Sequence, residues 1–343
     1  MIRFDCDYTE GCHPRVLAAL TAKNLEQHPG YGTDAHCDRA RELIRAACAA
    51  PAADVHFLVG GTQVNTAVIA AALRPWEGVL SAESGHIACH ETGAIEAAGH
   101  KVLTLPHENG KLSAPALEAA VKALRGDPNA EHIVQPGMVY ISQPTEYGTV
   151  YTRAELTAIS AVCRAAGLPL YMDGARLGCA LAAEKDLTLA DYAALCDVFT
   201  IGGTKMGLLF GEAAVICADA LKPCFRNVMK QRGGMLAKGR LLGVQYEVMF
   251  EDGLYLACGA HAVGEARRIR AALLERDLPL AFDSPTNQLF VILTRAQRAA
   301  LERDFALGVW DTGGGETDTL RICTSWATVP AHTDALIAAI RAL

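Results

Sequence analysis

Residues 198–205 read Val198-Phe199-Thr200-Ile201-Gly202-Gly203-Thr204-Lys205, and this stretch is the most informative part of the chain. Its mostly apolar first half predicts a buried strand over 198–201, and the Gly-Gly pair predicts a turn directly after it. A lysine that follows such a turn is unusual as a simple surface charge. Partial desolvation would favour its neutral amine, which is the form that attacks a carbonyl to make an imine. The stretch therefore predicts a nucleophilic lysine at the end of a strand.

Two earlier stretches have the same order of strand and turn. Val59-Gly60-Gly61-Thr62-Gln63 ends an apolar run and opens a helical pattern, with Thr62 suited to the N-cap. Free backbone N–H groups at a helix start bind anions, although a plain strand-to-helix turn remains the alternative. Tyr171-Met172-Asp173-Gly174-Ala175-Arg176 places Asp173 where an apolar run ends. A carboxylate at that edge of an α/β sheet can keep a pyridine nitrogen protonated, or it can simply cap the next helix.

Short apolar runs alternate with helical patterns over much of the chain. This alternation predicts a mainly parallel sheet covered by helices, an α/β fold with three layers. The expected strands are Val55–Val59, Val79–Ala82, Lys101–Leu105, Met138–Ser142, Leu170–Asp173, Val198–Ile201 and Ala214–Cys217. The expected helices between them are Thr62–Leu73, Glu91–Ala98, Ala114–Leu124, Arg153–Ala166 and Leu189–Leu195.

The C-terminal part of the chain has a different pattern. A long helical pattern over 238–276, broken by Gly253 and Gly259, leads to two expected strands at 288–293 and 319–324. We therefore expect a small C-terminal α+β domain beside the large one. The expected divisions are an N-terminal arm at 1–22, a large cofactor-binding domain at 23–240, and a linking helix with the small domain at 241–343.

Length and charge argue against several classes of protein. The chain has 343 residues, which suggests about two domains, and a formal net charge of −7. Lys and Arg are scattered, so the basic field of a general nucleic-acid binder is missing. No apolar run reaches the length of a membrane-spanning helix, and Asp5, Asp7 and Glu10 stand where a signal peptide would be apolar. We expect a cytoplasmic protein without nucleic-acid or membrane partners, whose 12 cysteines are reduced.

The three motifs follow one order along the chain: a phosphate turn, an aspartate for a pyridine ring, and a lysine. That order resembles the large class of pyridoxal 5'-phosphate (PLP) enzymes with the aspartate-aminotransferase fold. Over nearly its whole length the sequence also resembles a narrower family, the low-specificity L-threonine aldolases of the aromatic/β-eliminating lyase group. The matching motifs are Gly30–Asp34, Gly61–Gln63, Gly85–Ile87, Met172–Arg176, Gly203–Lys205 and Leu320–Thr324.

The resemblance implies how the cofactor is held. Gly61–Gln63 would bind its phosphate, and Lys238 in a locally basic segment would reach the same group, unless that segment is a solvated helix face. His86 would stack on the ring, Asp173 would face the pyridine nitrogen, and Lys205 would form the Schiff base.

The resemblance also implies how the amino-acid substrate is held. Arg176 would lie near the cofactor's phenolic oxygen and the substrate, while Arg321 would clamp the substrate carboxylate as a bidentate pair. Tyr31 would reach into the neighbouring subunit's site, so a homodimer or homotetramer with shared active sites is expected. Two positions depart from the family pattern. Cys6 stands for a serine near the substrate carboxylate, and Glu146 stands for a histidine beside the substrate hydroxyl.

His86 allows other interpretations as well. It could act as a general base, directly or through water, in addition to stacking. Together with Cys89 and His90 it presents two histidines four residues apart, as metal sites do, but no third ligand is evident. We therefore expect no metal.

The predicted activity is aldol cleavage of a β-hydroxy-α-amino acid, such as L-threonine or L-allo-threonine, to glycine and an aldehyde. Lys205, His86, Asp173 and Glu146 are the expected catalytic residues. Another PLP-dependent lyase, a racemase or an aminotransferase of the same fold is the alternative. A nicotinamide oxidoreductase is disfavoured because no G-x-G-x-x-G motif is present.

Overall fold

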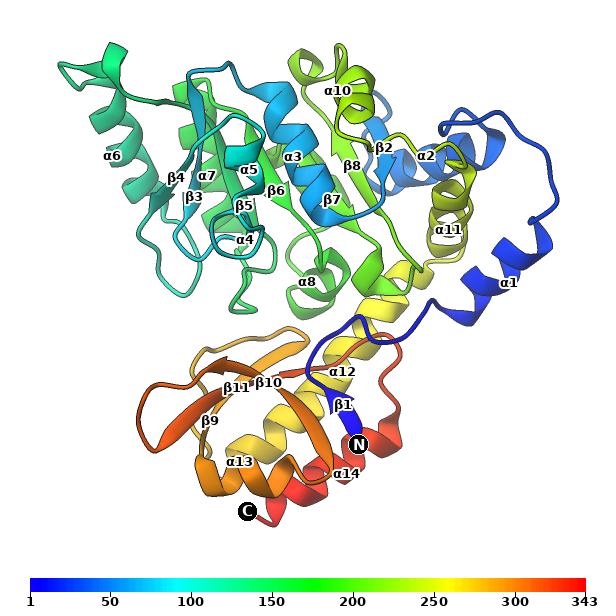
Figure 1. The fold of residues 1–343 in the computed structure, drawn as a ribbon, viewed down its shortest axis with the longest axis vertical. Coiled ribbons are helices and arrows are strands. Elements are labelled where there is room, and N and C mark those ends of the chain that lie inside the picture. The colour runs from blue at the N-terminus through cyan, green and yellow to red at the C-terminus, as the bar shows by residue number, and fades with distance from the viewer.

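A seven-stranded sheet forms the centre of the larger domain in the computed structural model, which describes residues 1–343 (Figure 1). The strand order is β2-β8-β7-β6-β5-β3-β4, and β8 is antiparallel to both neighbours while the other pairs are parallel. The predicted mainly parallel sheet is therefore confirmed. The strands are β2 Asp54–Leu58, β3 Glu77–Ala82, β4 Val102–Leu105, β5 Gln135–Ser142, β6 Leu170–Asp173, β7 Val198–Gly202 and β8 Glu212–Ile216.

Helices cover both faces of this sheet, as expected for strands that are apolar along their whole length. Leu170 and Met172 of β6 belong to the core on one face, whereas Tyr171 between them belongs to the core on the other. The Tyr171 face is covered by α3 (Gly61–Ala72), α4 (His86–Cys89), α5 (Ala94–Ala97) and α10 (Phe225–Gln231). The opposite face is covered by α2 (Ala35–Ala47), α6 (Ala114–Arg125), α7 (Arg153–Ala166), α8 (Leu177–Ala183), α9 (Leu189–Leu195) and α11 (Arg240–Glu251).

The helical stretch after residue 238 is two helices, α11 and α12 (Leu254–Glu275). They meet at Gly253, whose φ of 70° lies in the left-handed region, so the predicted break there is confirmed. The break predicted at Gly259 is wrong, because this residue lies inside α12. A Cβ on Gly259 would lie 2.2 Å from the carbonyl oxygen of Gly178, so the glycine allows α12 to approach α8 closely.

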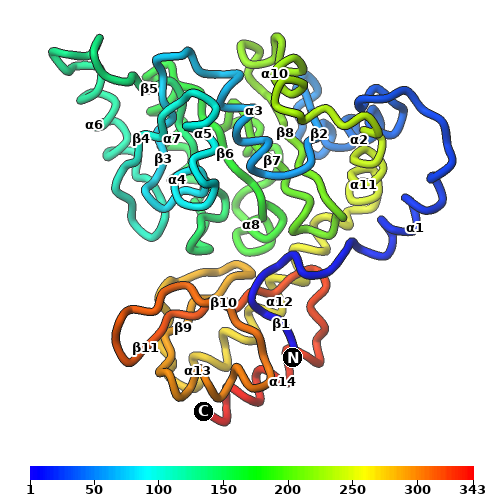
Figure 2. Tube along the Cα trace, viewed as in Figure 1, coloured from blue at the N-terminus to red at the C-terminus, as the bar shows by residue number.

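The small domain is built on a four-stranded sheet in the order β1-β10-β11-β9. Its elements are β1 Ile2–Phe4, β9 Gln288–Thr294, β10 Phe305–Asp311, β11 Thr317–Cys323, α13 Arg295–Leu301 and α14 Pro330–Arg341. β1 pairs parallel with β10, and both helices and α12 pack on the sheet. The tube in Figure 2 shows the chain leaving β1, passing between the two domains and reaching α1 (Pro14–Ala22) beside the large domain. The expected N-terminal arm at 1–22 therefore contains the strand β1, a crossing segment over residues 5–13, and the helix α1.

Candidate active site

The carboxyl ends of β2, β5, β6 and β7 meet at one edge of the large sheet, where a cavity of about 320 Å³ opens. Parallel α/β sheets bind their ligands at this edge. Tyr8 of the crossing segment forms part of the wall. The cavity brings together seven of the predicted site residues: Gly61, Thr62, His86, Glu146, Asp173, Arg176 and Lys205.

The first turn of α3 forms one side of the cavity. Its N-cap is Gly60 and not Thr62 as expected, because the helix already begins at Gly61. Gly60 has no side chain to cap the helix, so the first N–H groups have no acceptor within the helix or from its cap. A Cβ at Gly60 or Gly61 would meet nothing within 4 Å, which leaves the space before these donors open. Open donors at the positive end of a helix suit a phosphate group.

Asp173 lies at the end of β6 and is oriented by three donors. The Tyr140 hydroxyl and the Asn65 amide donate to Oδ2 over 2.8 and 3.1 Å, and the Ala175 N–H donates to Oδ1 over 2.9 Å. Only 7% of Asp173 is exposed. The capping alternative does not apply to α8, whose N-cap residue is Arg176. The carboxylate is therefore a fixed acceptor in the cavity wall.

Glu91 positions the ring of His86. Its Oε1 accepts hydrogen bonds from His86 Nδ1 at 2.9 Å and from the Asn65 amide at 2.7 Å. Burial lowers the pKa of His86, but the bond to Glu91 and the charges of Glu146 and Asp173 outweigh burial, so that the pKa is raised. His86 Nδ1 therefore carries the proton that it donates to Glu91, and Nε2 is free to bond other groups.

Arg176 forms a bidentate ion pair with Asp7 of the crossing segment. Nε lies 2.5 Å from Oδ2 and Nη2 lies 2.9 Å from Oδ1, while the Asn287 amide donates to Oδ2 at 2.9 Å. Burial would raise the pKa of Asp7, but Arg176 outweighs it and lowers the pKa from 3.8 to about 2. The three residues come from the N-terminal segment, the start of α8 and the loop before β9. Asp7 therefore links Arg176 of the large domain to Asn287 of the small domain, beside the cavity.

Lys205 lies in the 3₁₀ turn Thr204–Met206 that follows β7. A Cβ on Gly202 would lie 2.3 Å from the Ala175 carbonyl oxygen, and one on Gly203 would lie 2.5 Å from Leu208 Cδ2. Close packing therefore requires the Gly-Gly pair, which fixes where the chain leaves the strand. The Lys205 side chain lines the cavity and makes no hydrogen bond or ion pair within the chain.

Glu146 lies on the loop after β5 and lines the cavity as well. It is half-buried and forms no ion pair, although its charge acts on His86 and Arg176. Glu146 therefore does not pair with a nearby arginine. The carboxylate remains available to a molecule in the cavity.

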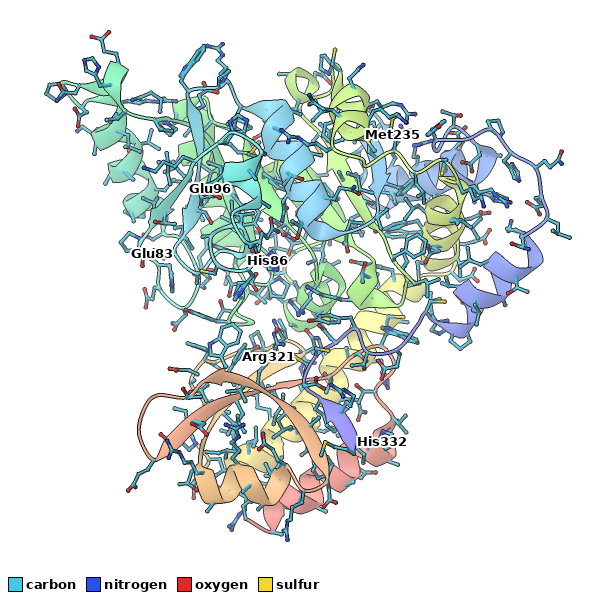
Figure 3. All side chains as sticks on the ribbon, in the orientation of Figure 1. Glu83, His86, Glu96, Met235, Arg321 and His332 are labelled. Atoms are coloured by element: carbon cyan, nitrogen blue, oxygen red, sulfur yellow. The ribbon has the colours of Figure 1, made fainter.

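Arg321 of β11 approaches the site from the small domain. Figure 3 shows it opposite His86, on the side of the small domain that faces the large one. Its Nη2 donates to the Asp5 carbonyl at 3.0 Å, whereas its buried Nε has no hydrogen-bond partner. It does not line the cavity directly, but its charge acts on Cys6 and on Tyr8 of the cavity wall. Cys6 is half-buried, and burial raises the pKa of its thiol.

Three predicted residues have side chains that do not line the cavity of their own chain. Gln63 turns its side chain to the backbone, where Nε2 donates to the Arg232 carbonyl at 3.4 Å. Tyr31 and Lys238 lie close together on the surface of the large domain, since the Tyr31 N–H donates to the Ala237 carbonyl at 3.1 Å. Tyr31 is 47% exposed. A role for Tyr31 and Lys238 in a neighbouring subunit stays a prediction.

Several residues of the site were missed from the sequence. Glu91 follows His86 by five positions, but no periodicity marks it as the partner of that ring. No pattern in the sequence marked Asn287 as a residue of the site. Glu212 could have been noticed, because a carboxylate at the start of the apolar strand β8 is unusual. Its buried side chain lines the cavity beside Lys205.

Histidines and acidic residues also gather outside the cavity. One such group has ligand atoms close enough together to share a metal ion: Glu26, His28 and His36. The Lys23 ammonium, a positive charge, lies 3.3 Å from His36 Nδ1 in the same group. His86, Cys89 and His90 form no such group. The Cys89 thiol instead donates to the Glu83 carbonyl at 2.8 Å.

This geometry agrees with comparisons to known proteins. The beta-eliminating lyase family matches residues 7–296. A low specificity L-threonine aldolase of Pseudomonas sp. (strain NCIMB 10558) is 33% identical, covering 99% of this chain and 97% of its own. The chain belongs to the threonine aldolase branch of the beta-eliminating lyase family. The predicted family is thereby confirmed, and with it the prediction that the chain is a lyase.

Solved structures agree with this assignment. The Leishmania major threonine aldolase is 46% identical and superposes with a TM-score of 0.97, covering 100% of this chain and 99% of its own. The Thermus thermophilus aspartate aminotransferase is 14% identical with a TM-score of 0.71, covering 100% and 91%, and this likeness shows the fold alone. The predicted aspartate-aminotransferase fold is confirmed. No helix has the length and apolar character needed to cross a bilayer.

Proposed function

We propose that this enzyme cleaves β-hydroxy-α-amino acids, such as L-threonine or L-allo-threonine, to glycine and an aldehyde with pyridoxal 5'-phosphate as its cofactor. One observation carries the proposal: Lys205, Asp173 and the open first turn of α3 line the same cavity. The similarity to low specificity L-threonine aldolases, two from Pseudomonas and one from yeast, supports the choice of substrate class.

The residues of the cavity fit the cofactor. The first turn of α3, with Gly61, Thr62 and Gln63, offers backbone N–H donors for its phosphate, Asp173 offers an oriented carboxylate for its ring nitrogen, and Lys205 offers an unpaired amine for its aldehyde. When bound, the cofactor supplies an electron sink for the pair released from the broken carbon–carbon bond. The protein's task is then to hold the amino acid and to move protons.

Two arginines serve the substrate carboxylate in this proposal. Arg321 has a buried Nε without a partner, so a carboxylate there would satisfy a donor that is otherwise unpaired. Arg176 contributes its charge from the cavity wall, where Asp7 holds it in place. Cys6 lies beside this region and adds a small, weakly polar side chain.

The β-hydroxyl needs a group that accepts its proton. Glu146 lines the cavity and makes no ion pair, so its oxygens are free to accept. His86 has a raised pKa, which increases the protonated fraction of its ring near neutral pH. We therefore assign proton acceptance to Glu146, and ring stacking with a proton-donating role to His86.

We also propose that the active form is a homodimer or homotetramer. Tyr31 and Lys238 lie on an exposed surface away from their own cavity, and closed symmetric assemblies are the usual arrangement of identical chains. In this assembly Tyr31 would complete the partner's substrate site, and Lys238 would reach its phosphate. Sedimentation of the holoenzyme together with its specific activity checks the assignment, and a fully active monomer would contradict it.

A substrate panel with product identification tests the proposed reaction. L-Threonine and L-allo-threonine should each give equal amounts of glycine and acetaldehyde. Release of ammonia or of a keto acid in place of glycine would overturn the proposal in favour of elimination or transamination. Lys205→Ala should lose the visible absorption of the bound cofactor and all turnover, whereas Lys185→Ala on the exposed surface should keep both.

A further inference from the structure

The loop between α1 and α2 brings two histidines and a glutamate together at the edge of the large domain, beside α11 (Figure 1). Glu26 and His28 lie in the loop, and His36 lies in the first turn of α2. One ligand atom from each of the three lies within 4.8 Å of the others. The group is separate from the cavity and has no part in the proposed reaction.

The atoms that meet in this group are the ones that a metal ion would use. Glu26 Oε2 lies 2.9 Å from His28 Nε2 and 3.1 Å from His36 Nε2. Two ligand atoms on a tetrahedral zinc ion lie about 3.3 Å apart, because each bond to the metal is about 2.0–2.1 Å long. Both nitrogens therefore already lie near the distance from the carboxylate oxygen that zinc requires.

His36 lies between two carboxylates. Its Nδ1 is 2.7 Å from Glu247 Oε2 on α11, while its Nε2 faces Glu26. A neutral imidazole has one N–H donor, so it can donate to only one of the two carboxylates. A bond to Glu247 directs the Nε2 lone pair at the Glu26 oxygen, and a cation between these two atoms removes the conflict. The cation can be a second proton or a metal ion, and a carboxylate on the other ring nitrogen is the usual support of a metal-binding histidine.

The surroundings of the group allow an ion to enter. The Glu26 side chain is 44% exposed, whereas those of His28 and His36 are mostly buried. The bonds from both histidines lower the pKa of Glu26 from 4.5 to about 2, so its carboxylate is ionised at neutral pH. The Lys23 ammonium is the cation in contact with the group, 3.3 Å from His36 Nδ1. It has no other partner, and its flexible stem lets it turn toward water.

We propose that Glu26, His28 and His36 form a binding site for a divalent transition-metal ion such as Zn²⁺. Two imidazoles and one carboxylate suit zinc and its neighbours in the first row, whereas calcium and magnesium take oxygen ligands. The fourth position faces the exposed side of the group, where water can fill it. The ion joins the two ends of a loop, ten residues apart, that contains Tyr31. It therefore fixes this loop, and the proposal does not depend on the proposed function.

The experiment titrates the full chain with Zn²⁺ in a calorimeter, after treatment with a chelator and dialysis. The wild type should bind one Zn²⁺ per chain with a Kd of about 10 µM or tighter, and Zn²⁺ should raise its midpoint of thermal unfolding. His36→Ala should lose both effects. Glu247→Gln removes the carboxylate behind His36 and should weaken binding about 10–100-fold. Lys23→Met removes the competing ammonium and should bind Zn²⁺ more tightly than the wild type.

His132→Ala is the matched control. His132 is an exposed histidine that belongs to no group of possible metal ligands, so this variant should bind Zn²⁺ like the wild type. His28→Ala serves as the test if His36→Ala fails to fold, because His28 lies in the loop and outside every helix and strand.

Two results would overturn the proposal. A wild type without Zn²⁺ binding at this affinity would mean that the cation between His36 and Glu26 is a proton and that the group is a hydrogen-bonded network. Binding that persists unchanged in His36→Ala would place the ion elsewhere, for example at the exposed thiols of Cys89 and Cys224. Loss of binding and of the thermal shift in His36→Ala, with the metal-free midpoint of the wild type, supports the site.

Discussion

Removing the charge of Asp7 should weaken the junction between the two domains. Asp7 and Arg176 are both buried, and Asn287 of the small domain donates to the same carboxylate. Asp7→Asn keeps the shape of the side chain but leaves the Arg176 guanidinium without its counter-charge. We expect the variant to fold with a lower free energy of unfolding.

The magnitude follows from the pKa of Asp7, which the native environment lowers from 3.8 to about 2. That difference corresponds to about 2.5 kcal/mol of stability at neutral pH. Breaking a buried pair by removing one partner typically costs about 3–5 kcal/mol, so a loss of about 2.5–5 kcal/mol is expected. Because the pKa is lowered in the folded state, this stability is present above pH 3.8 and is lost as the pH falls toward 2.

Urea unfolding at pH 7, 5 and 3 measures this loss. Asp5→Asn is the matched control, because Asp5 lies in the same segment but pairs with the exposed Arg3. That variant should unfold almost like the wild type, since exposed ion pairs add little. An Asp7→Asn protein as stable as the wild type at pH 7 would refute the reasoning. So would a difference in stability that stays constant between pH 7 and pH 3.

Four further variants test the site. Arg321→Ala should lower kcat/KM by more than tenfold while the cofactor stays bound, because truncating a buried charge-assisted pair costs about 2–5 kcal/mol; loss of cofactor with unchanged substrate kinetics would count against it. Glu146→Gln should slow threonine cleavage but spare glycine binding, which involves no β-hydroxyl; equal kinetics would remove Glu146 from the chemistry. Glu91→Gln should lower the pKa of His86 and so move the alkaline limb of the pH–rate profile to lower pH, because His86 acts in its protonated form; an unmoved limb would contradict the link. Tyr31→Ala should reduce activity without changing the spectrum of the bound cofactor, which separates a substrate role from a cofactor role.

The sequence predicted the large domain well because its strands are continuous apolar runs. β6 and α7 match the expected bounds at both ends, and the order of turn, aspartate and lysine led to the cavity. The strand β10 was not predicted. Gly308 interrupts its centre and its second half is largely exposed, so neither a long apolar run nor a clear alternation marks it.

The rest of the site depends on contacts between distant parts of the chain. The bond between Asp7 and Arg176 spans 169 positions and appears only after folding. Glu212 could have been noticed as a carboxylate in an apolar strand, but its place in the cavity wall could not, because the antiparallel pairing of β8 with β7 creates it. Periodicity describes which face a residue is on and carries no information about its neighbours from other elements.

The parallel pairing of β1 with β10 has a consequence for synthesis on the ribosome. Ile2 is made long before its partner Phe305, because the two residues lie far apart in the sequence. The large domain has all its strands before β10 is translated, so it can fold first, while the opening segment waits without a partner. Asn287 also arrives late, so the contacts around Asp7 close last. A nascent or truncated chain that ends before β10 would expose an unpaired β1 edge, which is a feature that recruits chaperones or promotes aggregation.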